Sequence, residues 1–466
     1  MLEVERDFSL QNHKNERLKG AVLDLTDLIN KYAPNIKKVI GKQFNRMKFS
    51  NKNPKIFFIP NNDSIGNIDF DTDAWYKLQL GALKEQGYPK VKTLADYEKV
   101  ISTYVKKHPT TSDGKPTVGL SLLADDWRFV ISVTNPAFWA TGASDDGEFY
   151  IDPVTYKAQV HLFRPEEKEY VRWLNHMNTI GLLDKESFTQ KYDQYLAKVA
   201  TGRVVGLIDA NWEVGNAINS LKAAGKFDQT YGRFGAVLKS GMKAAYNQPT
   251  GFRGGYGVGI STACKDPVRA IKFLDYLASD EAQVLFNWGI EGKHYNVVNG
   301  KRVIPDEVQK QKANDNNAFT RTTGIGNYGI SLRYGNGVKD KTGNFYTTTF
   351  PEQILASYSD AEKAALKAYK VSFWNDLLPK PSSFKPKAWA AAWSIPVAQD
   401  SPLSEFWNKE QDITRKFIPK AILGSPEEFD KTYDDMLVEL KKSVGNLEDL
   451  ETQLVQDRLK LWGTLK

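Results

Sequence analysis

Polar and aromatic side chains follow three apolar runs that the sequence predicts to be buried strands. The runs lie at residues 56–59, 118–123 and 204–208. The loops after them contain, in chain order, Asn61 and Asp63, then Asp126, Trp127 and Arg128, and then Asn211, Trp212 and Glu213. In open α/β sheets, ligands bind outside the carboxyl ends of the strands. An indole offers a sugar ring a flat apolar face, and carboxylates, amides and guanidinium groups pair with its hydroxyls, so this mixture is typical of a carbohydrate site.

Trp212 is the strongest single candidate for stacking on a ligand, and Trp127 is the next. Each has an alternative role, which is packing between helices in the interior. Arg253 and Tyr256 flank a pair of glycines just before another short apolar run, so both are placed to reach a ligand. For Arg253 the alternative is a solvated position in its loop.

The carboxylates in these loops raise the alternative of catalysis, because glycoside hydrolases use a pair of them. The residues available are Asp125, Asp126 and Glu213. Side chains that are adjacent in sequence usually point in different directions, and carboxylates in a sugar site commonly just accept hydroxyl hydrogens. The five histidines, at 13, 108, 161, 176 and 294, lack the spacings of zinc sites, and the sequence has no nucleophile elbow and no P-loop. We therefore expect a binding protein and not an enzyme.

Residues 69–73 begin like a calcium-binding EF-hand loop, with aspartates at alternate positions. Such a loop requires glycine at its sixth position and glutamate at its twelfth. Here those positions hold Ala74 and Leu80. The single cysteine, Cys264, excludes both a disulfide within the chain and a cysteine-rich metal site. We expect no metal ion and no cofactor.

The composition limits the class of protein further. A chain of 466 residues is long enough for two or more domains. Its formal charge of +7 comes from 63 basic and 56 acidic residues that are scattered along the sequence, so we expect no binding to nucleic acid. No stretch reaches the ~20 consecutive apolar residues of a membrane span. The first residues also lack the basic start and apolar run of a signal peptide.

Short apolar runs alternate with amphipathic helical patterns, which predicts an α/β fold with a largely parallel sheet. A helix is expected over 94–105, with Thr93 as its N-cap and Asp96 completing a capping box. Further helices are expected after Pro165, over 192–200 and after the Asp266–Pro267 start. The C-terminal part is predicted to be helical, with a capping box at Ser425.

A set of short segments, taken in their order along the chain, resembles one protein family. They are LINKYAPN at 28–35, GYPKVKTLADY at 87–97, SDEAQ at 279–283, WGIEGKHY at 288–295 and IPKAILG at 418–424. The segments are similar to those of the extracellular solute-binding proteins of ABC importers, in the branch of the LplA/YtcQ lipoproteins. The resemblance covers nearly the whole chain.

The resemblance implies a two-lobe, periplasmic-binding-protein-like (type II) fold with a hinge, a central cleft and a helical C-terminal part. Lobe one would hold residues 1–117 and 256–325, and lobe two residues 118–255 and 326–466. It also implies an oligosaccharide or related glycan as ligand, the transmembrane subunits of an ABC permease as partner, and a monomer. Family members lie on the extracellular face of the membrane, where full-length relatives are lipid-anchored.

The chain begins almost at the LINKYAPN segment, so we expect it to lack the first strands of lobe one, the anchor cysteine and the first ligand-contacting loop. Two functional alternatives stay open beside transport. One is a carbohydrate-active enzyme of the glycoside hydrolase type, and the other is a glycan-sensing surface protein without a permease. Arg128, Arg253 and the net positive charge make glycans that contain uronic acids a candidate ligand class.

Overall fold

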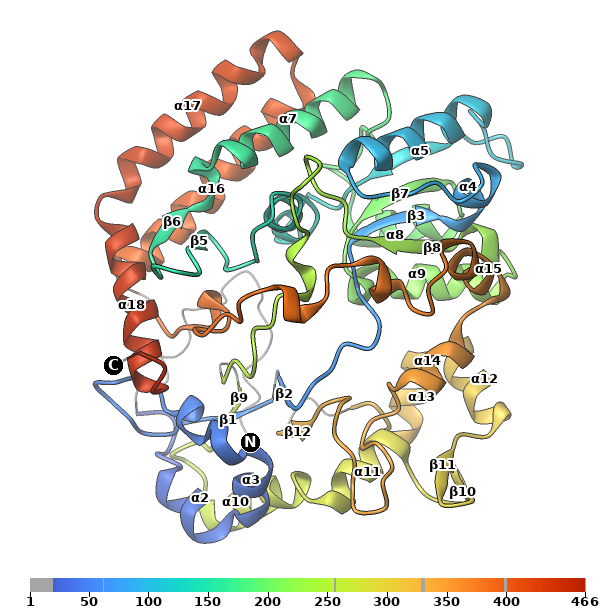
Figure 1. The fold of residues 1–466 in the computed structure, drawn as a ribbon. Coiled ribbons are helices and arrows are strands. Elements are labelled where there is room, and N and C mark those ends of the chain that lie inside the picture. The colour runs from blue at the N-terminus through green and yellow to red at the C-terminus, as the bar shows by residue number, and fades with distance from the viewer. Residues whose placement is uncertain (1–19, 62, 255–256, 328–331, 398–399, 466) are drawn as a thin grey trace.

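A mixed β-sheet at the upper right of Figure 1 forms one part of the larger hydrophobic core, which extends to the C-terminal helices. The computed structural model describes residues 20–61, 63–254, 257–327, 332–397 and 400–465. The sheet has the order β4-β7-β3-β8, formed by β4 (Val118–Ser121), β7 (Val204–Ile208), β3 (Tyr76–Gln79) and β8 (Tyr231–Phe234). Strands β4 and β7 are parallel, but β3 runs antiparallel to both β7 and β8. The prediction of a largely parallel sheet was therefore wrong.

Helices cover both faces of this sheet, which explains why most residues of its strands are buried. On one face lies α5 (Leu94–Lys107), which packs so closely that a Cβ at Gly206 would stand 2.6 Å from Ile101 Cδ1 and 2.7 Å from the Tyr97 hydroxyl. On the other face, α8 (Tyr192–Ala200) and α9 (Asn211–Ala223) form a separate core with β7. A further helix, α4 (Leu80–Glu85), follows β3 directly. Glycine at 206 is thus required by the close approach of α5.

The helix starts that the sequence marks are formed, but one of the predicted caps is not. Thr93 and Asp96 make the expected capping box at the start of α5. Asp266 caps α10 (Pro267–Leu277) by accepting a hydrogen bond from the Arg269 N–H. The capping box expected at Ser425 is not formed, because the hydroxyl of Ser425 donates to the Glu428 side chain at 3.4 Å instead of accepting from the backbone.

A second hydrophobic core lies at the bottom of Figure 1. It joins α2 (Thr26–Tyr32), α3 (Pro34–Ile40), α10 and the antiparallel pair β1 (Ile59–Pro60) and β9 (Gly257–Val258). The Asp275 carboxylate on α10 accepts hydrogen bonds of 2.8 Å from the Ile36 N–H and the Asn35 amide at the start of α3. A carboxylate at a helix N-terminus is favourable, so Asp275 fixes α3 on α10.

The WGIEGKHY segment forms a tight turn after α11 (Asp280–Trp288). Gly289 has a φ of 82°, and a Cβ there would lie 2.5 Å from His294 Nδ1. His294 Nδ1 accepts a hydrogen bond of 3.1 Å from the Ile290 N–H, and the Trp288 indole donates to the Phe345 carbonyl at 3.0 Å. These contacts give the segment a structural role in closing the turn.

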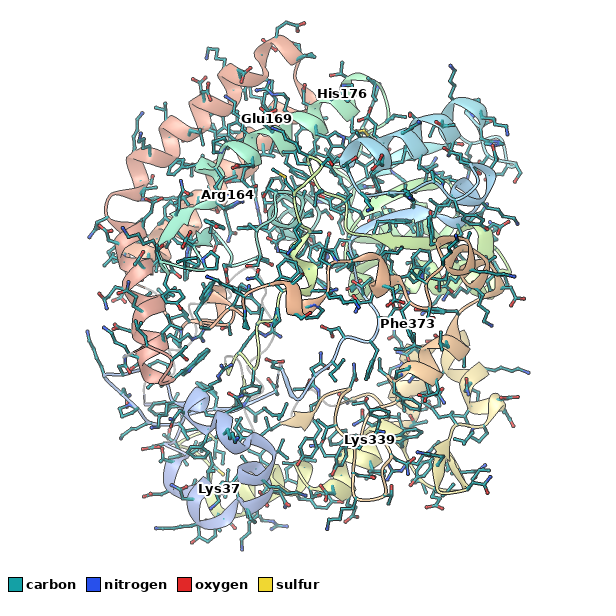
Figure 2. All side chains as sticks on the ribbon, viewed as in Figure 1. Lys37, Arg164, Glu169, His176, Lys339 and Phe373 are labelled. Atoms are coloured by element: carbon teal, nitrogen blue, oxygen red, sulfur yellow. The ribbon has the colours of Figure 1, made fainter. Side chains whose placement is uncertain are left out.

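Three long helices and one short β-hairpin, at the left of Figure 1, build the predicted helical C-terminal part together with α7 (Pro165–Thr179). They are α16 (Pro402–Leu423), α17 (Pro426–Val444), α18 (Leu447–Leu461) and the hairpin of β5 (Phe149–Ile151) with β6 (Ala158–Val160). Arg164, at the start of α7 in Figure 2, donates to Glu167 at 3.0 Å and to the Thr141 hydroxyl at 2.9 Å. Arg164 thus fastens the start of α7 to Thr141.

Short elements complete the described chain. They are β2 (Ser64–Ile65), β10 (Asn296–Val298), β11 (Lys301–Val303), β12 (Arg333–Tyr334), α6 (Asn135–Ala140), α12 (Asp306–Asn314), α13 (Asn316–Thr323), α14 (Pro351–Ser357) and α15 (Asp360–Tyr369). Among the described residues, no helix combines the length and the apolar character that crossing a membrane requires. The division into lobes at 117/118, 255/256 and 325/326 stays a prediction, and the core places β3 and α5 with the sheet of residues 118–234.

Buried carboxyl groups collect where α18 meets the β5–β6 hairpin. Burial raises the pKa of Glu451 to about 8 and that of Glu148 to about 7, and each of these carboxyls opposes ionisation of its neighbour. Burial also raises the pKa of Asp146 to about 6, although Lys387 lies 3.2 Å away. Other groups that act on the cluster are Glu410, His161 and Arg458. The folded chain therefore holds protons here that the unfolded chain releases.

We expect the folded protein to lose stability as the pH rises from 4.5 through about 8, because unfolded Glu451 ionises from its ordinary pKa of 4.5 while the folded carboxyl stays protonated. Glu451→Gln removes the ionisable group and with it this pH dependence of stability. Its melting temperature should match that of the wild type at pH 4 and exceed it by several degrees at pH 8, in thermal melts across that range. Glu439→Gln, at an exposed position on α17, is the control. Equal pH slopes for wild type and Glu451→Gln would contradict the assignment.

Candidate functional site

Two of the three predicted loops lie side by side because of the sheet topology. Strands β4 and β7 are neighbours and parallel, so their carboxyl ends meet at the same edge of the sheet. The loop after β4 carries Asp126, Trp127 and Arg128, and α9 begins at Asn211 directly after β7. Residues that are about 85 positions apart thereby come into contact, as the Arg128–Glu213 hydrogen bonds show.

The indoles of Trp127 and Trp212 are parallel at this edge. Their ring centroids are 6.1 Å apart and their planes differ by 2°. Trp212 is 56% exposed and Trp127 is partly buried, so neither side chain is a core residue. The alternative of packing in the interior is thus excluded for Trp212. Two parallel aromatic faces suit a flat, weakly polar ligand surface such as the C–H face of a sugar.

Arg128 is held in place by two carboxylates and two aromatic rings. Its Nε donates to both Glu213 oxygens at 3.1 and 3.0 Å, and its Nη1 donates to Asp126 Oδ2 at 2.5 Å. The guanidinium carbon lies 4.8 Å from the centroid of the Trp127 ring and 4.1 Å from that of Tyr192. Because Arg128 stacks on Trp127, the ion pairs also fix the orientation of that indole.

The charges of this group stabilise one another. Glu213 is 2% exposed, and burial raises the pKa of its carboxyl while the Arg128 guanidinium opposes that rise. Burial alone would lower the pKa of Arg128, but Glu213 and Asp126 outweigh it and raise the pKa. The Tyr192 hydroxyl donates to the backbone carbonyl of Glu213 at 2.9 Å. Glu213 therefore serves as the anchor of Arg128 and faces the protein more than the solvent.

A buried polar layer supports the start of α9 from below. The ammonium group of Lys77, which is fully buried, donates to the Asp209 carbonyl at 2.5 Å and to the Ala74 carbonyl at 3.3 Å. Burial raises the pKa of the Asp209 carboxyl to about 7, and the Tyr195 hydroxyl donates to it at 2.9 Å. The backbone N–H of Asn211 donates to Asp73 Oδ1 at 2.8 Å. Asn211 is thus placed by its main chain.

Sequence reasoning missed these supporting residues. Lys77 gave no clear signal in the sequence, because β3 reads Tyr-Lys-Leu-Gln and does not stand out as a buried strand in which a lysine would need specific partners. Tyr192 and Tyr195 looked like core residues on one face of their helix, and nothing in their spacing revealed the contact with Glu213 or Asp209.

The third predicted loop forms a separate group with Arg253. The Arg253 N–H donates to Asp63 Oδ2 at 2.7 Å, and its Nε lies 3.5 Å from the same oxygen. The Arg253 guanidinium lies 5.0 Å from the ring centroid of Trp393. The backbone carbonyl of Asn61 accepts from Arg333 Nη1 at 2.6 Å. Tyr256 lies outside the described residues, and the ligand contacts of all these side chains stay predictions.

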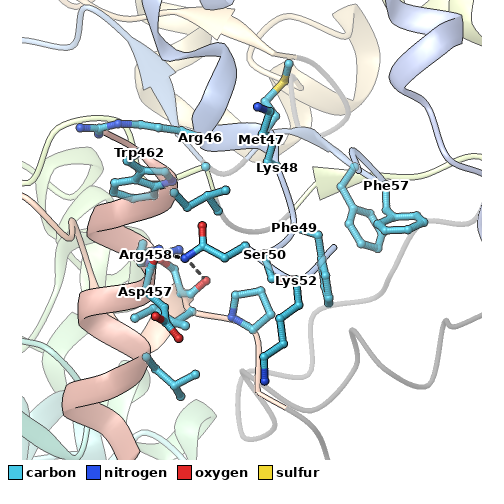
Figure 3. A pocket seen from close by; sticks show the side chains of 18 residues that line it. Arg46, Met47, Lys48, Phe49, Ser50, Lys52, Phe57, Asp457, Arg458 and Trp462 are labelled. Atoms are coloured by element: carbon cyan, nitrogen blue, oxygen red, sulfur yellow. Dashed lines mark hydrogen bonds between the residues drawn. The ribbon is translucent and has the colours of Figure 1, made fainter. Parts of the chain in front are cut away.

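A cavity of about 190 Å³ lies between the segment 46–58 and α18 (Figure 3). The Trp462 ring is approached by two guanidinium groups, those of Arg46 at 4.4 Å and Arg458 at 4.6 Å. The Asn51 amide donates to the Asp457 carbonyl at 2.6 Å. The predicted ligand-binding residues are absent from the lining of this cavity, so it is a different place from the edge of β4 and β7.

Metal binding gains no support from the part of the chain that the structure describes. Within it, no group of three or more His, Cys, Asp or Glu side chains could hold an ion. In the 69–73 segment, Asp71 pairs with Arg233 at 2.8 Å and Asp73 lies 3.5 Å from Lys77. These aspartates thus have basic partners within the protein.

The sequence of this chain is similar to those of known proteins. The family described as bacterial extracellular solute-binding protein matches residues 124–284. The fructooligosaccharide ABC transporter substrate-binding protein FusA of Streptococcus pneumoniae serotype 4 is 25% identical over 190 residues, which are 39% of this chain and 34% of that protein. The alignment thus spans about a third of the length of this curated relative.

Solved structures resemble nearly the whole chain. FusA of S. pneumoniae in complex with kestose has a TM-score of 0.63 at 17% identity and covers 94% of this chain and 83% of its own. A solute-binding protein from Bifidobacterium longum infantis, described as binding HMO, has a TM-score of 0.65 at 14% identity over 97% and 85%. The alginate-binding protein AlgQ2 has a TM-score of 0.62 at 18% identity over 96% and 84%.

These likenesses confirm the predicted periplasmic-binding-protein-like α/β fold. The edge of β4 and β7, where the parallel indoles lie, falls partly within the segment that matches the family. Residues 124–284 thus match the family of bacterial extracellular solute-binding proteins, and nearly the whole chain shares the fold of solved solute-binding proteins.

Proposed function

We propose that this chain is the ligand-binding component of an ABC importer, and that it captures an oligosaccharide or related glycan for a membrane permease. The observation that carries the proposal is the pair of parallel indoles, Trp127 and Trp212, at the carboxyl ends of β4 and β7. Arg128 is fixed beside them by Glu213 and Asp126. The relative FusA, whose name describes a fructooligosaccharide, supports the same class of ligand.

Binding would proceed by closure of the two predicted lobes about the glycan. Three segments run between the sheet and the lower core, after β2, before β9 and after α14 (Figure 1). Near the first of them, Asp71 Oδ2 accepts hydrogen bonds from Arg233 at 2.8 Å and from the Tyr358 hydroxyl at 2.6 Å. A ligand that gains contacts only in the closed state shifts the equilibrium toward it.

The arrangement favours binding over hydrolysis. A glycoside hydrolase needs one carboxylic acid and one carboxylate that are both directed at the sugar bond. Here the two candidates, Asp126 and Glu213, share the same guanidinium, and Glu213 is almost fully buried. We therefore propose that the captured glycan leaves unchanged and passes to the permease on the extracellular face of the membrane.

A thermal-shift screen against neutral and acidic oligosaccharides tests this function. A ligand that binds only the folded state at 100 times its Kd stabilises it by about 2.7 kcal/mol, which we expect to raise the melting temperature of a chain of this length by roughly 3 °C. The glycan should be recovered intact by chromatography after incubation. Shorter sugars in the recovered sample, or a cooperatively melting protein that no glycan shifts, would contradict the proposal.

A further inference from the structure

Three basic side chains described near the parallel indoles, Arg128, Lys191 and Lys77, have carboxylate or carbonyl partners. The Arg128 guanidinium contacts both Glu213 and Asp126, so this group of three carries more acidic than basic groups. Two of the three Arg128 nitrogens, Nε and Nη1, are already engaged by these carboxylates, which weakens any bidentate contact with a ligand carboxylate. Arg128 is therefore a fixed structural element of the site.

The two neighbouring lysines do not reverse this balance. Lys191 lies 2.7 Å from Asp125 in the same loop, and Lys77 is buried beneath α9, where it donates to the Asp209 carbonyl. Within the described part of the chain, the contacts around the indoles and the start of α9 join five carboxyl groups to three basic groups, namely Asp73, Asp125, Asp126, Asp209 and Glu213 to Lys77, Arg128 and Lys191. The site is thus neutral to negative in charge.

Two arginines near the linking segments, Arg253 and Arg233 of β8, are also paired with carboxylates. Arg253 pairs with Asp63 at 3.5 Å and Arg233 with Asp71 at 2.8 Å. The net positive charge of the chain consequently lies elsewhere, for example at Arg46, Lys48 and Lys52 beside the cavity of Figure 3. The overall charge of +7 does not describe the environment of the indoles.

We propose that the site accepts neutral oligosaccharides and rejects glycans that contain uronic acids, an inference that rests on the proposed function. A uronate would bring its negative charge next to Asp126 and Glu213, two carboxylates that share the single Arg128 guanidinium, and this costs both Coulomb energy and desolvation. Hydroxyl groups of a neutral sugar instead donate to carboxylate oxygens such as those of half-exposed Asp126. This replaces the uronic-acid ligands that the sequence suggested from Arg128 and Arg253.

The test compares tetrasaccharides of equal length by thermal shift and by titration calorimetry at pH 7. The neutral probes are maltotetraose, cellotetraose and nystose, and the acidic probes are tetragalacturonate and a mannuronate tetramer. We expect binding of at least one neutral probe, with acidic probes weaker by about 30-fold or more in Kd, corresponding to ~2 kcal/mol. Higher salt should narrow the difference, because it screens the repulsion.

Asp126→Asn provides the matched variant, since it removes one carboxylate and leaves Glu213 on Arg128. It should reduce the discrimination against tetragalacturonate several-fold, whereas Asp228→Asn, at an exposed ion pair with Lys84 on the far side of the sheet, should not. Tight binding of an acidic probe by the wild type overturns this inference and leaves the proposed function standing. Failure of both probe classes to bind the folded protein overturns the two together.

Discussion

Replacing Trp212 with alanine is expected to weaken glycan binding by about 30-fold, which corresponds to a loss of ~2 kcal/mol from a binding hot spot. The indole of Trp212 is 56% exposed and parallel to that of Trp127, so it offers its face to a ligand rather than to the core. Because the side chain is exposed, the free energy of unfolding should change by only about 0.5 kcal/mol. Titration calorimetry with the glycan that gives the largest thermal shift measures the first effect, and a thermal melt measures the second.

Phe227→Ala is the control for this substitution. Phe227 is an aromatic side chain with 41% exposure in the turn that follows α9, at the opposite end of that helix from Trp212. The Phe227→Ala substitution should leave the Kd for the glycan unchanged. An equal loss of affinity in both variants, or unchanged affinity in Trp212→Ala, would place the ligand away from the parallel indoles.

Arg128→Leu should lower the free energy of unfolding by ~3 kcal/mol, because removing one partner of a buried ion pair leaves the other charge without compensation. Glu213 is 2% exposed and loses both of its Arg128 hydrogen bonds in this variant. The loss should be larger at pH 8 than at pH 4, since burial raises the pKa of Glu213 and acid protonates its unpaired carboxyl. Chemical denaturation at both pH values gives the comparison.

Two further variants test whether the loss of stability in Arg128→Leu comes from the buried Glu213 charge. Arg172→Leu removes an arginine whose ion pair with Asp430 is exposed, so its cost should stay below about 1 kcal/mol. The double variant Arg128→Leu with Glu213→Gln should recover part of the stability, because the buried charge is gone. A loss in Arg128→Leu no larger than that in Arg172→Leu would show that the Glu213 pair does not stabilise the fold.

Local signals in the sequence predicted the elements that depend on neighbouring residues. The Thr93 capping box and the Asp266–Pro267 helix start are formed by residues within three or four positions of one another, so their spacing alone reveals them. The strand at 204–208 was visible as an unbroken apolar run. At Ser425 the same kind of signal failed, because the hydroxyl turned to the Glu428 side chain.

Pairing between distant segments could not be predicted in the same way. Strand β3 is only four residues long, and Lys77 interrupts its apolar pattern, so neither its existence nor its antiparallel pairing with β7 and β8 was evident. The loops with Trp127 and Trp212 were found because they follow apolar runs. Their stacking, and the ion pair of Arg128 with Glu213, depend on the parallel contact of β4 and β7.

The charge of the site shows how far residue types alone can mislead. Arg128 and Arg253 suggested an acidic ligand while their partners were unknown. The structure places Glu213 and Asp126 on the first and Asp63 on the second, so the same arginines now indicate a neutral ligand.

The most direct measurement is a calorimetric titration of the wild-type protein with the best neutral tetrasaccharide, followed by chromatography of the recovered sugar. The account predicts saturable binding at one site, a tetrasaccharide that is recovered intact, and a Kd that Trp212→Ala weakens by about 30-fold. Recovery of shorter sugars, or binding that is the same with and without the Trp212 indole, would contradict the central claim that this protein captures a glycan on the parallel indoles.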